Sequence, residues 1–186
     1  MGLSSHNFIK FSYVFFKNII LFYPVYLKRL ILTNCQSSEL TLNFKPNIGH
    51  RHLFNVFYFF NLSSFLRLKS SVDITVVDFI STTKRFKIIY SLLSVTLNNR
   101  VNVSFYFDDN TNLYSVSSIF NSADWMEREV FDMFGIYFLF HQNFRKILTD
   151  YGYLESPLRK NFPLTGFYEV FYSKYLNRIF YSNLIS

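Results

Sequence analysis

Two runs of alternating apolar side chains constrain the fold of this chain more than any other feature. Every second residue is apolar in residues 86–92 and again in residues 101–107, and Asn98 and Asn99 lie between the two runs. A period of two is typical of β-strands, and asparagine tolerates the positive φ angles of tight turns. A β-branched run at residues 72–80, bounded by serines and threonines, precedes them. The sequence therefore predicts three consecutive antiparallel strands.

The stretch from Asn121 to Gly135 is the strongest helix candidate. Asn121 or Ser122 can cap its beginning, and Gly135 stands where a left-handed residue commonly ends a helix. One face, at helical spacing, consists of Ala123, Met126, Val130, Met133 and Phe134. The other face consists of Glu127, Arg128, Glu129 and Asp132. Arg128 and Asp132 are spaced to form an ion pair. We expect the apolar face in the core and the charged face toward solvent or a partner.

The region before these strands is less clearly defined. Residues 50–66 hold an aromatic run that fits a helix or a buried strand equally well. Residues 9–23 fit an amphipathic helix that packs within the protein or its assembly, with contact to a lipid surface as the alternative. Charged residues interrupt residues 8–32, so the uncharged run of about 18 residues that a membrane span needs is missing there. Neither a secretory signal nor a clear transit peptide is expected.

The composition points to a partner. The chain has 25 Phe and 14 Tyr but a single alanine, Ala123, and so much aromatic surface is difficult to bury within one domain of 186 residues. An AT-rich, organelle-encoded gene would give the same bias. Charge is uneven: up to Arg100 there are 12 Lys and Arg against 3 Asp and Glu, and from Val101 there are 7 against 9. The basic half suits nucleic acid, anionic lipid or an acidic protein.

Catalytic and cofactor sites are poorly supported. Glu127, Glu129, Asp132 and His141 could form a metal or acid–base site, but Glu127 and Glu129 point about 200° apart on a helix. We therefore favour a structural role for them. The sequence contains no glycine-rich nucleotide loop and no GxSxG nucleophile turn. Cys35 is the single cysteine, so neither a disulfide nor a thiolate cluster is expected. A mitochondrial RNA-associated or ribosomal role for the basic, aromatic first half is the alternative.

Residues 123–136 read ADWMEREVFDMFGI. This segment resembles the W-x-E-R-E-x-x-D-x-F-G-I signature of the 30-kDa subunit family of respiratory complex I, also called NADH dehydrogenase subunit 9. Residues 138–152 resemble the F-x-x-H-P-x-L-R-R-I-L-T-D-Y-G segment of that family, and residues 157–172 its P-L-R-K-D-F-P-L-x-G-x-x-E-V-x-Y segment. The resemblance runs in collinear order from about Val72 to the end. The departures are Gln142 for proline, Glu155 and Ser156 for Gly-His, and Asn161 for aspartate.

The resemblance implies a non-catalytic core subunit of the matrix-side, peripheral arm of mitochondrial complex I, the proton-translocating NADH:ubiquinone oxidoreductase of the inner membrane. It implies no flavin, iron–sulfur cluster or quinone in this chain, with FMN and the clusters held by neighbouring subunits. The expected fold is α/β (α+β): an antiparallel sheet with packed helices, an N-terminal amphipathic helix and an extended C-terminal tail. The expected regions are 1–71, 72–148 and 149–186, the last docking on the 49-kDa quinone-site subunit.

The matching positions give the candidate interface residues. They are Trp125, Glu127, Arg128, Glu129, Asp132, Gly135, Arg145, Asp150, Arg159, Lys160 and Pro163. Among these, the aromatic and the basic side chains are expected to contact the 49-kDa neighbour, because aromatic and arginine side chains are common interface anchors. The alternative places Trp125 in the core and pairs Arg145 internally. The basic first half could face supernumerary subunits; no nucleic acid and no transmembrane span are expected.

Overall fold

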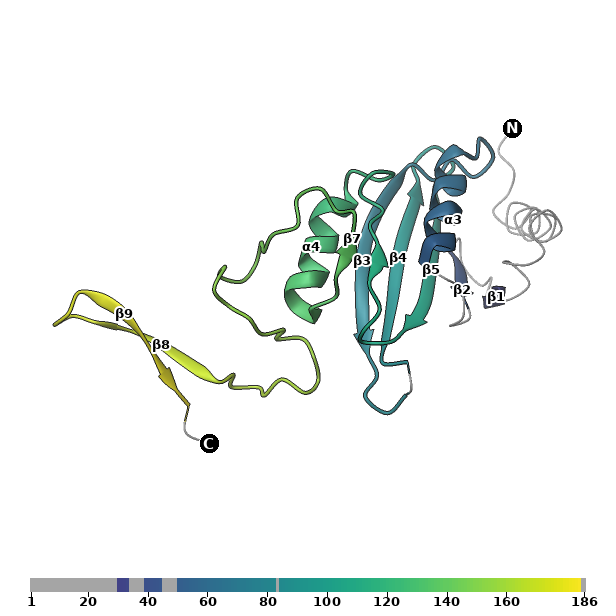
Figure 1. Cartoon of the computed structure of the whole chain (residues 1–186). Coiled ribbons are helices and arrows are strands. Elements are labelled where there is room, and N and C mark those ends of the chain that lie inside the picture. The colour runs from purple at the N-terminus through teal and green to yellow at the C-terminus, as the bar shows by residue number, and fades with distance from the viewer. Residues whose placement is uncertain (1–29, 34–38, 45–49, 83, 185–186) are drawn as a thin grey trace.

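The computed structural model describes residues 30–33, 39–44, 50–82 and 84–184, which Figure 1 shows as coloured ribbon. A five-stranded sheet carries two helices, and a two-stranded hairpin lies at the C-terminal end, away from the sheet. The helix predicted at residues 9–23 lies outside the described residues. Within the described ranges, no helix combines the length and the hydropathy needed to cross a bilayer.

The three predicted antiparallel strands form one half of the sheet. They are β3 (Ser70–Asp78), β4 (Phe86–Ser94) and β5 (Asn99–Phe107), and both strand pairs are antiparallel. Alternate side chains of β4 and β5 are buried in the core, as the period of two predicts. This part of the prediction is confirmed.

Two strands from earlier in the chain complete the sheet. They are β1 (Leu30–Thr33) and β2 (Glu39–Phe44), and the sheet order is β1-β2-β5-β4-β3. The expected sheet is antiparallel, and the other strand pairs of this sheet are, but β2 pairs with β5 in parallel. Two strands that pair in parallel need a long connection between them, and their pairing leaves no local sequence signal.

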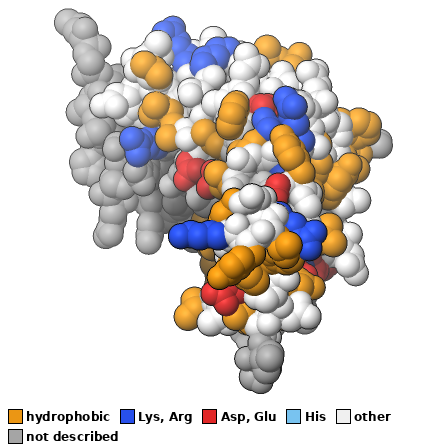
Figure 2. Space-filling view, turned by 90° about the vertical axis from the view of Figure 1, so that its left-hand side faces the viewer, with side chains coloured by type: hydrophobic (Ala, Val, Ile, Leu, Met, Phe, Trp, Pro, Cys, Tyr) orange, Lys and Arg blue, Asp and Glu red, His pale blue; other side chains and the backbone are white. Residues whose placement is uncertain are grey.

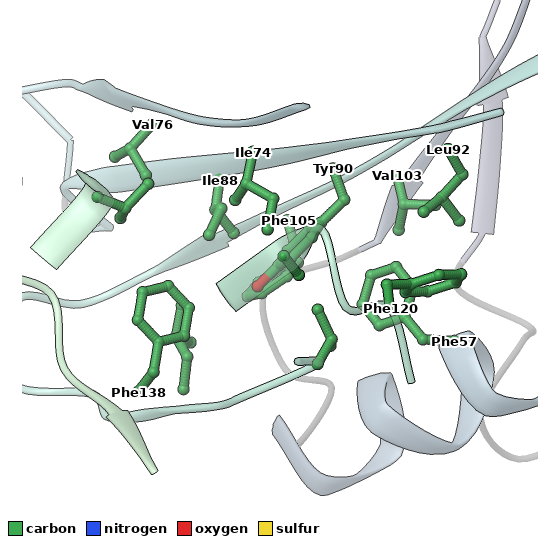
Figure 3. Packing of buried hydrophobic residues seen from close by; sticks show 14 of the residues in the cluster. Phe57, Ile74, Val76, Ile88, Tyr90, Leu92, Val103, Phe105, Phe120 and Phe138 are labelled. Atoms are coloured by element: carbon green, nitrogen blue, oxygen red, sulfur yellow. The ribbon is translucent and has the colours of Figure 1, made fainter. Parts of the chain in front are cut away.

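Helix α3 (His50–Leu62) resolves the ambiguity of the aromatic run in favour of a helix. Phe57 and Phe60, three residues apart, are buried against the sheet, and the Phe57 ring centre lies 4.8 Å from that of Tyr90. Figure 3 shows Phe57 and Phe120 side by side below the sheet residues Val103 and Leu92. The core therefore lies between one face of the sheet and the helices, which is the α+β architecture expected from the sequence.

Helix α4 (Ala123–Phe134) lies between two short strands, β6 (Leu113–Tyr114) and β7 (Phe138–Leu139), which pair in parallel. Gly135 is left-handed with φ 68° and its N–H donates to Phe131 O, so the predicted C-terminal cap is confirmed. The predicted Ser122 cap is wrong. Ser122 has helical backbone angles, and its hydroxyl donates to Ser71 O at 2.8 Å, which connects α4 to β3 instead.

After β7 the chain runs without a helix or strand until β8 (Tyr168–Ser173) and β9 (Arg178–Asn183). These two strands pair antiparallel over six register positions. An extended tail is what the sequence analysis expects, but the hairpin within it is not. The division into regions 1–71, 72–148 and 149–186 stays a prediction.

Candidate functional site

The charged face of α4 is largely buried, which corrects the expectation that it faces solvent or a partner. Glu127, Arg128 and Asp132 are 0%, 6% and 1% exposed, and only Glu129 of the four is exposed. The reason is that three separate segments of the chain fold against α4 and bring hydrogen-bond partners to these groups. We call Glu127, Arg128 and Asp132 the α4 anchors.

Glu127 connects α4 to the segment that follows β6. Its carboxylate accepts hydrogen bonds from the Ser115 hydroxyl at 2.6 Å and from the Val116 N–H at 2.7 Å. His141, with a fully buried side chain, places Nε2 3.9 Å from Glu127 Oε2 and 3.3 Å from Asp124 Oδ1. Burial raises the pKa of Glu127 from its ordinary 4.5 to about 7, although the Ser115 and Val116 hydrogen bonds act in the opposite direction.

Arg128 lies between a carbonyl, a carboxylate and an aromatic ring. Its Nε donates to Arg145 O at 3.0 Å, and its Nη1 is 3.8 Å from Asp124 Oδ2. The expected partner Asp132 is bound elsewhere, so the predicted i, i+4 pair is wrong. The guanidinium also stacks on Trp125, with Cζ 5.1 Å from the ring centre. Trp125 itself is 64% exposed, so the alternative that placed it in the core is excluded.

Asp132 holds residues 146–149, which lie in the loop after β7. One carboxylate oxygen accepts from the N–H groups of Ile147 and Leu148 at 2.7 and 2.8 Å and from that of Thr149 at 3.5 Å. Lys146 Nζ lies 3.8 Å from the other oxygen. Burial alone would raise the pKa of Asp132, but these N–H donors and Lys146 together hold it below its usual value.

Gly135 and Arg159 hold the next part of the tail against the end of α4. Arg159 Nε donates to Phe134 O at 2.5 Å, and its Nη2 lies 3.0 Å from Asp109 Oδ1. A Cβ at Gly135 would lie 2.6 Å from Ser156 Oγ and 3.1 Å from Arg159 Nη2. Position 135 therefore requires glycine both for its positive φ and for the close approach of the tail.

A cluster around Asp78, at the end of β3, completes the attachment. Arg85 forms a two-pronged pair with Asp78 at 2.8 and 2.9 Å and also donates to the Asn161 side chain. The backbone N–H of Lys160 donates to Asp78 Oδ2 at 2.9 Å. The hydrogen bond from Arg85 is the main reason that the pKa of Asp78 is lowered. We call Asp78, Arg85, Asp109 and Arg159 the β3 cluster.

The remaining predicted residues lie on the exposed side of α4 and along the tail. Glu129, Arg145, Asp150 and Lys160 are exposed, and Pro163 is half-buried. Asp150 accepts from the Tyr151 N–H at 2.8 Å, and Pro163 O accepts from the Gly166 N–H at 3.0 Å, so both shape local turns. Whether the exposed residues contact another subunit stays a prediction. Among the described residues, no group of three His, Cys, Asp or Glu side chains lies close enough to hold a metal ion.

Sequence analysis did not identify Asp78, Arg85, Asp109 or Ser115 as site residues. Asp78 and Arg85 flank the turn between β3 and β4, where charged residues are normally solvated, and their partners Lys160 and Asn161 are more than 70 residues away. Only the resemblance, which marks Arg159 and Lys160, could have directed attention to this end of the sheet. Together, the α4 anchors and the β3 cluster fasten residues 145–161 to the core through polar contacts.

The tail beyond this point displays apolar side chains. Leu154, Leu158, Leu164 and Tyr175 are exposed, and so are most side chains of β8 and β9. Figure 2 views the molecule from this side and shows hydrophobic side chains among Lys, Arg, Asp and Glu over the visible surface. Exposed apolar groups of this density are typical of a surface that another protein covers.

The chain matches, over residues 47–168, the family described as "Respiratory-chain NADH dehydrogenase, 30 Kd subunit". It is 40% identical over 162 residues to "NADH-ubiquinone oxidoreductase subunit 9" of Reclinomonas americana, covering 87% of this chain and 76% of that protein. It is 46% identical over 121 residues to "NADH dehydrogenase (ubiquinone) iron-sulfur protein 3" of Arabidopsis thaliana, covering 65% of this chain and 64% of that one. The mitochondrial protein of the same name from Candida albicans is 40% identical over 146 residues, which cover 78% of this chain and 51% of that protein. The chain thus spans half to three quarters of these relatives.

Two solved structures share the fold. One is the trypsin-resistant fragment (1-134) of Nqo5, with a TM-score of 0.55 and 20% identity, covering 66% of this chain and 96% of the fragment. The other is a chain of the membrane-bound sulfane sulfur reductase, described as an archaeal respiratory membrane complex, with a TM-score of 0.65 and 22% identity over 82% of this chain and 86% of that one. At this level of identity the two structures establish the fold alone.

Proposed function

The chain belongs to the respiratory-chain NADH dehydrogenase 30 Kd subunit family, and we propose that it is a structural subunit of the peripheral, matrix-side arm of mitochondrial complex I. In this proposal the chain holds the 49-kDa quinone-site subunit in place and so supports electron transfer from NADH to ubiquinone without carrying out a chemical step. The names of the relatives support a place in an NADH:ubiquinone oxidoreductase and, for the Candida protein, in mitochondria.

The observation that carries the proposal is the contrast within the C-terminal third. The α4 anchors and the β3 cluster fix residues 145–161 on the core, whereas the side chains of β8 and β9 point outward with no core of their own. A segment that is fixed at its base and apolar along its length is suited to bind a neighbouring protein. We place the 49-kDa subunit against residues 149–184, and Trp125, Arg145 and Lys160 at the edge of the same contact.

We propose that the chain carries no cofactor of its own. Four cysteines, or cysteines with histidines, ligate a typical iron–sulfur cluster, and this sequence has Cys35 alone. FMN and the clusters would lie in neighbouring subunits of the inner-membrane complex. The buried carboxylates Glu127 and Asp132 both accept hydrogen bonds from other segments of the chain, which supports structural roles for both.

The alternative, an RNA-associated protein, finds no support in the comparisons. The described residues of the basic first half form strands β1 to β4 and helix α3, and the family match points to a respiratory complex. Recovery of the tagged chain with ribosomal subunits, instead of with NADH-oxidising activity on a native gel, would favour the alternative.

Truncation after Leu148 tests the proposal. The variant keeps the sheet, α3 and α4 but loses the hairpin and the contacts of Arg159, Lys160 and Asn161 with the core, so we expect loss of the assembled peripheral arm and of NADH:ubiquinone activity. Native gels and NADH oxidation of mitochondrial membranes measure both. The full-length Val95→Ala variant is the control, because Val95 is 75% exposed in the turn between β4 and β5, outside residues 149–184. A truncated chain that still assembles into an active complex refutes the proposal.

A further inference from the structure

The two faces of the β8–β9 hairpin differ in chemistry. Residues opposite each other in an antiparallel pair point to the same side, and successive residues point to opposite sides. The register, which aligns Val170 with Tyr181 and Phe171 with Phe180, therefore sorts the side chains into two sets. One set, the tyrosine face, consists of Tyr168, Val170, Tyr172, Ile179, Tyr181 and Asn183. The other, the phenylalanine face, consists of Glu169, Phe171, Ser173, Arg178, Phe180 and Ser182.

The aromatic side chains of the phenylalanine face already contact one another and a cation within the hairpin. Phe171 and Phe180 stack with ring centres 5.7 Å apart and planes 17° apart, and the Arg178 guanidinium lies 4.5 Å from the centre of the Phe180 ring. Glu169, Ser173 and Ser182 are the other side chains of this face, and all three are polar. Nothing about this face requires a partner.

The tyrosine face is apolar and uncharged. Its five large side chains are between 56% and 65% exposed, and none of its six positions is Lys, Arg, Asp or Glu. A two-stranded hairpin alone is marginally stable in water and gains stability when one face is packed. The hairpin is held to the preceding segment at its base, where Leu184 N donates to Phe167 O and Phe167 contacts Phe162. The tyrosine face is therefore the surface whose burial would hold the hairpin in place.

The distribution of charge on the hairpin indicates the chemistry of its partner. Lys174, in the turn, and Arg178, at the start of β9, are both exposed at the tip, whereas Glu169 lies near the base. A lipid headgroup layer or a nucleic acid would be met by cations on the buried face itself, and the tyrosine face carries none. An uncharged protein surface with acceptors for tyrosine hydroxyls fits this face, and carboxylates fit the tip.

We propose that the tyrosine face of the β8–β9 hairpin docks on an uncharged, apolar surface of a neighbouring protein subunit, with a carboxylate of that subunit facing Lys174 at the tip. This inference rests on the proposed function and specifies it: it states which face of the hairpin is buried and what chemistry the receiving surface has. The phenylalanine face stays toward solvent.

Charge insertion on each face of the hairpin tests which face docks. Tyr181→Glu places a carboxylate on the tyrosine face, and Ser173→Glu places the same carboxylate on the phenylalanine face, opposite Arg178 in the register. We expect the tagged full-length Tyr181→Glu chain to recover at least about tenfold less peripheral arm from membranes, because a buried unpaired charge is strongly unfavourable. We expect Ser173→Glu to recover nearly the wild-type amount. Equal recovery with both variants overturns the inference.

Two further measurements complete the test. Lys174→Glu should weaken recovery several-fold at low salt and less at high salt, since salt screens charges at the rim of a contact. An unchanged recovery would overturn the proposed carboxylate opposite Lys174. Vesicles of phosphatidylcholine with phosphatidylglycerol test the lipid alternative. If the purified chain binds them and Tyr181→Glu abolishes this binding, the protein partner is overturned.

The outcomes separate this inference from the proposed function. If truncation after Leu148 prevents assembly while Tyr181→Glu does not, the structural role holds and the face assignment is wrong. If truncation has no effect, both are wrong. Thermal unfolding of each purified variant serves as a folding control, and we expect no change, because the hairpin lies away from the core.

Discussion

The core and the C-terminal segment of this chain hold their side chains in opposite ways. Residues 54–139 bury aromatic and aliphatic groups between the sheet and the helices, whereas residues 145–184 are attached through hydrogen bonds and display apolar groups outward. The first arrangement stabilises the chain by itself. The second leaves apolar surface available to another protein, so stability and binding are assigned to different regions of one small subunit.

Helix α4 joins the two regions. Its apolar residues Ala123 and Val130 pack in the core, while Asp132 and Arg128 hold the segment that follows. A buried polar group contributes most when every partner is present and costs most when one is removed. Substitutions on α4 should therefore separate the two regions experimentally.

The largest effect should come from the core. Phe86→Ala removes a ring that is fully buried between Phe107 and two arginines, and a cavity of this kind costs about 3–5 kcal/mol of the free energy of unfolding. Denaturant unfolding of the purified chain measures it. Tyr175→Ala, at a position 99% exposed in the hairpin turn, is the control and should change stability by less than about 0.5 kcal/mol. If both variants lower the free energy of unfolding by similar amounts, the core and the C-terminal segment do not differ in their contribution to stability.

Glu127 should give the core a distinctive response to pH. Because burial raises its pKa in the folded chain to about 7 from an ordinary 4.5, the folded state binds more protons between these values, and stability falls as pH rises from 4.5 to 7. The full change is on the order of 3 kcal/mol, since one pKa unit corresponds to about 1.4 kcal/mol. Unfolding at several pH values should show this slope, and Glu127→Gln should remove it. Glu129→Gln, on the exposed side of α4, should keep it.

Asp132 should respond to acid with the opposite sign. Its pKa lies below the usual value in the folded chain, so its contribution is present above the ordinary pKa of 3.8 and is lost as pH falls through the lowered value. Asp132→Ala leaves the N–H groups of Ile147 and Leu148 without their acceptor and should cost about 2 kcal/mol. Hydrogen exchange at these two amides should accelerate much more than in the core strands. Glu129→Ala is the control. If exchange at the Ile147 and Leu148 amides is the same in Asp132→Ala as in Glu129→Ala, Asp132 does not hold this segment on α4.

Gly135→Ala should have the smallest effect of the four. A side chain at φ 68° costs about 1–2 kcal/mol, and its Cβ would meet Ser156 and Arg159. Thermal unfolding and proteolysis of the tail measure the cost to the core and to the attachment separately. Gly152→Ala, with free space around the Cβ, should leave both unchanged. If the two alanine variants behave alike, the tail does not depend on its close contact with the end of α4.

Local patterns predicted the local structure well. The alternation at residues 86–107 predicted β4 and β5, and Gly135 predicted the end of α4, because strand faces and helix caps depend on nearby residues. The family resemblance also directed attention to Arg159 and Lys160, both of which take part in attaching the tail.

Long-range contacts explain what sequence reasoning missed. Glu127 and Asp132 have the composition of a solvated helix face, and only the arrival of Ser115 on one side and residues 147–149 on the other makes them buried. The parallel pairing of β2 with β5 has no local signature. The β8–β9 hairpin is built from aromatic residues that are exposed on both faces, so no alternation of polar and apolar side chains marks it.

The open edges of the β8–β9 hairpin have a consequence for the life of the chain in the cell. With two strands in that sheet, each strand within the described residues keeps one row of backbone N–H and C=O groups unpaired. A newly made copy that has not met its partner therefore carries an edge prone to aggregation and a site open to proteases. We expect unassembled copies to be short-lived, so that the supply of the partner sets how much of this subunit accumulates.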